Sequence, residues 1–61
     1  MTIPKDPYIL LSFINTKLRD EYPGIEDLCK SLNIDLYELE HALTGIEYTY
    51  VRELNQFTAV S

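Results

Sequence analysis

The chain has 61 residues with ten acidic and five basic side chains, so its net charge is −5 at pH 7, and 46% of its residues are apolar. This length holds a single domain over residues 1–61, and the composition is globular rather than disordered. The acidic charge counts against nucleic acid and membrane as partners, because phosphate and anionic lipid repel it. No signal-peptide pattern stands at the start and no apolar run approaches the roughly 18 residues of a membrane span. We therefore expect a soluble, cytoplasmic protein.

The first predicted helix covers residues 7–22 and follows a short extended arm over residues 1–5. Asp6 can accept hydrogen bonds from the first free amides of the helix, and Pro7 suits a first helical position, where no N–H is needed. The helix is expected to stop before Pro23 and Gly24. The residues of its predicted core stripe are Leu10, Leu11, Ile14, Leu18 and Tyr22.

Ile9 and Phe13 form a second, smaller apolar patch on the same helix, away from the core stripe. One explanation is that the C-terminal segment folds back over this patch. The other is that the patch is a subunit interface. The sequence leaves both explanations open.

The second and third helices are predicted at residues 24–32 and 36–44, in the arrangement of a helix-turn-helix. Asn33 follows the second helix directly and tolerates the left-handed conformation that ends helices. Asp35 and Glu38 have the spacing of a capping box, in which each side chain bonds the backbone amide of the other residue. The inner faces of the two helices are expected to hold Ile25, Leu28, Cys29, Leu32, Leu36, Leu39 and Leu43.

The tail changes to the alternating pattern of β-strands. Strands are predicted at residues 46–51 and 56–60, joined by a four-residue loop over residues 52–55. Because a lone hairpin is unstable in water, it should pack on the helices through Tyr48, Tyr50 and Phe57. The predicted fold class is mainly α with a small β-hairpin (α+β), and the order of elements is that of a minimal winged helix.

Three blocks of the sequence resemble a known family. They are "PKDPYILLSFINTKLRDEY" from Pro4 to Tyr22, "LCKSLNIDLYELEHAL" in the middle, and "IEYTYVRELNQF" near the end. The family consists of very short bacterial proteins known only as a domain of unknown function. The resemblance implies a small stand-alone cytosolic protein and implies no activity. The family has a glycine where Glu47 stands here.

The residues that could carry catalysis or bind metal are few. Cys29 is the only thiol and His41 the only imidazole. Cys29 falls on the inner face of its helix and His41 on the outer face, so we interpret them as a core thiol and a solvated imidazole rather than a catalytic pair. Glu38 and His41 alone do not make a metal site, and no glycine-rich phosphate loop exists. We expect no enzyme activity, no metal, no cofactor and no small-molecule substrate.

Nucleic-acid binding is the main alternative, because a winged helix places the outer face of its third helix in the major groove. The candidate nucleic-acid contacts are Lys17, Arg19, Lys30 and Arg52. However, no Lys or Arg occurs from residue 31 to 51, and residues 24–45 carry five acids against one lysine. This segment has a net charge of −4, which suits phosphate poorly.

The leading hypothesis is therefore a non-enzymatic protein-interaction module that binds a partner protein or forms a homodimer. Small domains often gain stability by dimerising, and tyrosine favours interfaces because it combines an apolar ring with a polar tip. The candidate interface residues are Tyr8, Ile9, Phe13, Tyr37 and His41.

Overall fold

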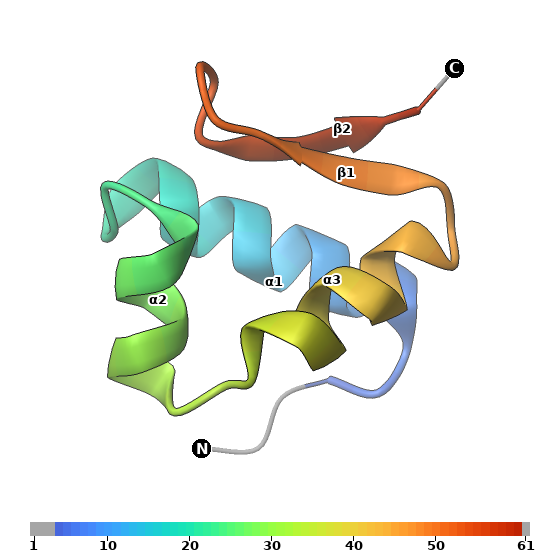
Figure 1. The fold of residues 1–61 in the computed structure, drawn as a ribbon, viewed down its shortest axis with the longest axis horizontal. Coiled ribbons are helices and arrows are strands. Elements are labelled where there is room, and N and C mark those ends of the chain that lie inside the picture. The colour runs from blue at the N-terminus through green and yellow to red at the C-terminus, as the bar shows by residue number, and fades with distance from the viewer. Residues whose placement is uncertain (1–3, 61) are drawn as a thin grey trace.

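The computed structural model describes residues 4–60 and contains three helices followed by a two-stranded antiparallel hairpin (Figure 1). The elements are α1 (Pro7–Asp20), α2 (Ile25–Leu32), α3 (Leu36–Thr44), β1 (Tyr48–Val51) and β2 (Gln56–Ala59). The predicted α+β class and the order of the elements are confirmed. Of the predicted extended arm, residues 1–3 lie outside the described residues.

Several predicted boundaries are wrong by one or two residues, each for a local reason. The carbonyl of Lys17 accepts from the amides of both Glu21 and Tyr22, so α1 closes before Tyr22. Gly24 is the extended N-cap of α2, a role that the sequence allows it, so the helix itself begins one residue later, at Ile25. Residues 46–47 form a hydrogen-bonded turn after α3, which delays β1 to Tyr48, and β2 ends one residue before the predicted residue 60.

The predicted caps form at the starts of α1 and α3. Asp6 Oδ1 accepts from the amides of Tyr8 and Ile9 at 2.8 and 3.2 Å. In the same way, Asp35 Oδ1 accepts from the amides of residues 37 and 38 at 2.8 and 3.3 Å. The predicted return bond from Glu38 to the amide of Asp35 is not among the hydrogen bonds within residues 4–60. Glu38 instead lines a surface groove, so the capping box is only half formed.

The turn between α2 and α3 is confirmed, because Asn33 is left-handed (φ 57°, ψ 47°) and ends α2. In the turn after α3, the left-handed residue is not the glycine. Gly45 is right-handed at φ −60°, whereas Glu47 takes the left-handed conformation at φ 62°. A glycine adopts that conformation freely, but a side chain crowds the following carbonyl. The turn into β1 therefore contains backbone strain at Glu47.

The core lies between the three helices and the inner face of the hairpin, which runs along one side of the helices (Figure 1). Its buried residues are Leu10, Ile14, Leu18, Ile25, Leu28, Cys29, Leu39, Leu43 and Phe57. The predicted inner residues Leu11, Tyr22, Leu32 and Leu36 are half-buried against it.

The hairpin packs through the aromatic residues that the sequence predicts. Phe57 is 3% exposed, and Tyr48 and Tyr50 are half-buried against the core. The rings of Tyr50 and Phe57 lie 5.5 Å apart between centroids. The four-residue loop is also confirmed, since Val51 pairs with Gln56. Within residues 4–60, no helix combines the length and apolar character needed to cross a bilayer.

Glu47→Gly should stabilise the protein by about 1 kcal/mol, because glycine removes the left-handed strain. For a domain of this size that corresponds to a rise in melting temperature of about 4–8 °C. Thermal unfolding followed by circular dichroism measures it. Glu47→Ala is the matched control, since it removes the same charge but keeps a Cβ. An equal gain in both variants would mean that charge, not backbone strain, limits stability at this turn.

Candidate functional site

A side-chain amide on α1 attaches the hairpin to the helices. Asn15 Nδ2 donates to the carbonyl of Phe57 at 3.0 Å, and Asn15 Oδ1 accepts from the amide of Phe57 at 2.8 Å. The side chain thus bonds the outer edge of β2 in the way that a neighbouring strand would. It fixes the position of β2 against α1.

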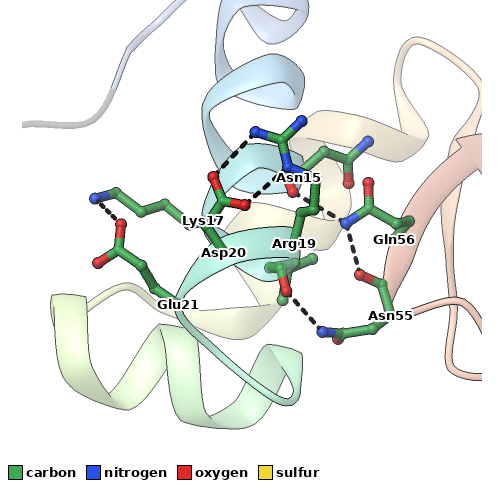
Figure 2. Close-up of polar contacts among 8 residues, drawn as sticks. Asn15, Lys17, Arg19, Asp20, Glu21, Asn55 and Gln56 are labelled. Atoms are coloured by element: carbon green, nitrogen blue, oxygen red, sulfur yellow. Dashed lines mark hydrogen bonds and ion pairs between the residues drawn. The ribbon is translucent and has the colours of Figure 1, made fainter.

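Two further amides, from Asn55 and Gln56, extend this attachment toward the C-terminal end of α1 (Figure 2). Asn55 Nδ2 donates to the carbonyls of Leu18 and Tyr22 at 3.0 and 2.9 Å, while its Oδ1 accepts from the Tyr50 hydroxyl at 2.6 Å. Gln56 Nε2 donates to the carbonyls of Asn15 and Asn55. These bonds give partners to carbonyls near the end of the helix. We call Asn15, Asn55 and Gln56 the amide cluster.

The amide cluster is not predictable from the sequence pattern alone, although two local signals are consistent with it. Asn15 is an uncharged amide beside the core stripe of α1, and Asn55 ends the hairpin loop, where its φ of 52° suits asparagine. Neither signal identifies the hydrogen-bond partner of the side chain, which lies about forty residues away in the chain.

The candidate binding feature is an open groove of ≈ 420 Å³ between the start of α1, the turn after α2 and one side of α3. Its walls are mostly apolar, and it carries one positive and one negative side chain. The lining residues are Pro4, Lys5, Leu10, Ile34, Glu38, Leu39 and Ala42. Grooves of this kind suit an apolar group flanked by polar contacts.

Tyr37 and His41, predicted to be interface residues, are both exposed on α3. Tyr37 is 86% exposed and neighbours the groove residue Glu38 in sequence. His41 likewise precedes the groove residue Ala42. Neither lines the groove itself, so they stand next to it along α3.

The apolar residues at the start of α1 differ in how far they are buried. Tyr8 and Ile9 are 63% and 60% exposed, so neither is covered within residues 4–60. Phe13 is half-buried against the core, and the ammonium group of Lys17 lies 5.7 Å from its ring centroid. The structure therefore leaves Ile9 uncovered and packs Phe13 against the core.

Three of the four cations named as candidate nucleic-acid contacts are paired with acids. Lys17 meets Glu21 at 2.7 Å and Arg19 meets Asp20 at 2.9 Å, as Figure 2 shows. Arg52 meets Glu26 at 2.9 Å, and this hydrogen bond, with one from the backbone, lowers the pKa of the Glu26 carboxyl. Lys30 is exposed on α2. Because three of these four cations are paired with acids, they form no concentrated patch of positive charge for phosphate to bind.

Cys29 has the environment of a structural thiol. It is 6% exposed, and its pKa is raised by burial and by the nearby charges of Glu40, Glu26 and Asp35. A raised pKa reduces the thiolate fraction and hence nucleophilicity at neutral pH. His41 is exposed on α3, while Cys29 lies in the core. Within residues 4–60, no three side chains of the His, Cys, Asp or Glu types gather as metal ligands would.

Comparison with known proteins identifies a family. A family model described as "Domain of unknown function (DUF4250)" matches residues 4–57. No curated protein and no solved structure matches the chain. The match spans all three helices and most of the hairpin, including the three members of the amide cluster.

Asn15→Asp should destabilise the protein by about 2 kcal/mol, because it replaces the donor to the Phe57 carbonyl with a second acceptor. Urea unfolding measures the loss. Thr16→Asp is the control, since it adds the same charge at the next, exposed position of α1 and should change stability by less than about 0.5 kcal/mol. Equal losses in the two variants would show that added charge on α1, not the bonds to Phe57, determines the effect.

Proposed function

The chain belongs to the DUF4250 family through residues 4–57, and from that starting point we propose that it is a non-enzymatic protein-interaction module on a winged-helix-like frame. Its binding site is the groove between the start of α1 and α3. Its partner is a protein segment that inserts an apolar side chain into the groove. Tyr37 and His41 supply contacts beside it.

The groove is the observation that carries this proposal. It is the place where apolar side chains of the core, Leu10 and Leu39, reach a hollow on the surface. An apolar anchor buried there gains affinity from the area removed from water. Tyr37 beside the groove has a large ring with a hydroxyl. Tyrosine is enriched among the interface residues that carry most of the binding energy.

Charge complementarity indicates the chemistry of the partner segment. The net charge of the chain is −5, and Glu38 and Glu40 lie on α3 beside exposed Tyr37. A segment that combines an apolar anchor with Lys or Arg residues would be attracted to this surface, and like charge would repel acidic competitors. We therefore assign the groove to a basic, apolar-anchored segment.

Ala42→Arg should abolish capture of such a partner, because the longer side chain occupies the groove and repels basic residues. The tagged protein is cross-linked in its native cells, and captured proteins are compared by mass spectrometry. Ser12→Arg is the control, since it adds the same charge at an exposed position of α1 outside the groove.

The expected result is a partner captured by the wild type and by Ser12→Arg but not by Ala42→Arg. With that partner purified, calorimetry should show at least about a tenfold weaker affinity for Ala42→Arg. Melting curves establish that both variants are folded. A capture pattern that is the same for both variants would contradict the groove as the binding site.

The electrophoretic mobility of random duplex DNA should not change when micromolar protein is added at about 50 mM salt. At such low salt, nucleic-acid binders gain affinity from the counterions they release. The acidic charge and the ion pairs at Lys17, Arg19 and Arg52 support this expectation. Electrophoretic mobility measures it. Micromolar binding that weakens with added salt would favour the helix-turn-helix nucleic-acid function instead.

A further inference from the structure

The backbone of β1 points its hydrogen-bonding groups alternately toward β2 and away from it. In the observed register, Tyr48 pairs with Ala59 and Tyr50 with Phe57. The amide of Val60 donates to the carbonyl of Glu47 at 2.7 Å, which places Glu47 at a hydrogen-bonded position of the ladder. Antiparallel pairs alternate, so Thr49 also bonds β2, whereas the backbone groups of Tyr48 and Tyr50 point outward.

The two outer edges of the hairpin differ in whether their outward backbone groups are hydrogen-bonded. On β2, the outward groups of Phe57 are bonded by the side chain of Asn15. On β1, the outward groups of Tyr48 and Tyr50 have no hydrogen-bond partner among residues 4–60. The strand itself, "YTYV", contains neither a charge nor a proline, the residues that usually protect an edge strand.

We propose that the β1 edge pairs with the β1 edge of a second copy of this chain, forming a four-stranded antiparallel sheet across a two-fold axis. Only one register joins both outward-facing residues: Tyr48 of one copy opposite Tyr50 of the other, and the reverse. Each of these pairs exchanges two backbone hydrogen bonds. Thr49 then faces its own counterpart on the axis, so the interface is self-complementary.

Charge complementarity supports this antiparallel arrangement. β1 is preceded by acidic Glu47 and followed by basic Arg52. Antiparallel pairing brings the Arg52 end of one copy to the Glu47 end of the other, twice in the dimer, whereas parallel pairing would place like charges together. Arg52 already holds Glu26 in its own chain and has further donors available for a second carboxylate.

The edge is short, so the association should be weak. A standard interface buries about 800 Å² on each partner, which is a large share of the 4291 Å² surface of this small chain. Four-residue strands supply less than this. We expect a dissociation constant on the order of 0.1 mM. None of the groove residues lies on β1, so the two proposed surfaces are separate.

Sedimentation equilibrium over a range up to about 1 mM tests the dimer. The wild type should approach twice its 7.1 kDa mass. Thr49→Lys should raise the dissociation constant at least about tenfold, because it sets two lysines directly opposite on the axis. Ala59→Lys, the same charge change at an exposed position of β2, should leave it within about twofold.

A cross-link tests the register. Across the axis, the two Cα atoms of residue 49 would lie about 4.5 Å apart, within disulfide range. Thr49→Cys should therefore yield an oxidised dimer linked through position 49, whereas Ala59→Cys at the same concentration should not.

A monomeric wild type at the highest concentration, or equal cross-linking of the two cysteine variants, would overturn the edge pairing. So would a dimer that Thr49→Lys leaves intact. If Ala42→Arg rather than Thr49→Lys dissociates that dimer, the groove binds a second copy, which would favour the groove and reject the edge. Loss of edge pairing alone leaves the capture experiment with Ala42→Arg unaffected.

Discussion

The attachment of the hairpin to α1 is the constraint on which the rest of the fold depends, because two short strands do not remain paired alone in water. The Phe57 ring provides the apolar burial, and the Asn15 side chain bonds both backbone groups of the same residue. Burial alone is non-directional, whereas the paired amide bonds determine where the strand lies. Among the described residues, every buried side-chain polar atom has a partner.

The elements that the sequence predicted well are those set by interactions within a few residues. Asp6, Asp35 and Asn33 act on amides or dihedral angles one turn away, and the structure places all three as expected. The core stripes follow from the period of the helix, which needs no knowledge of the partner. The boundary errors arise where a turn competes with a regular element, as after α3.

The groove and the amide cluster could not be predicted in the same way, because they depend on how distant segments meet. The groove joins three separate parts of the chain, and a hydrophobic pattern indicates which face is apolar but not where that face stays uncovered. Glu47 is another example. Its alternation with Tyr48 suggests a strand, yet the turn after α3 forces it into the left-handed region.

The long separation of the polar contacts between α1 and the hairpin has a consequence for the order of folding events. Asn15 and Phe57 are 42 residues apart, and Asn55 and Leu18 are 37 apart. Helices form locally within microseconds, whereas such distant contacts require closure of a loop of about forty residues. The Asn15 amide therefore bonds water until the hairpin docks. Docking should then complete the core and the polar bonds together, and we expect the hairpin and α1 to unfold as one cooperative unit.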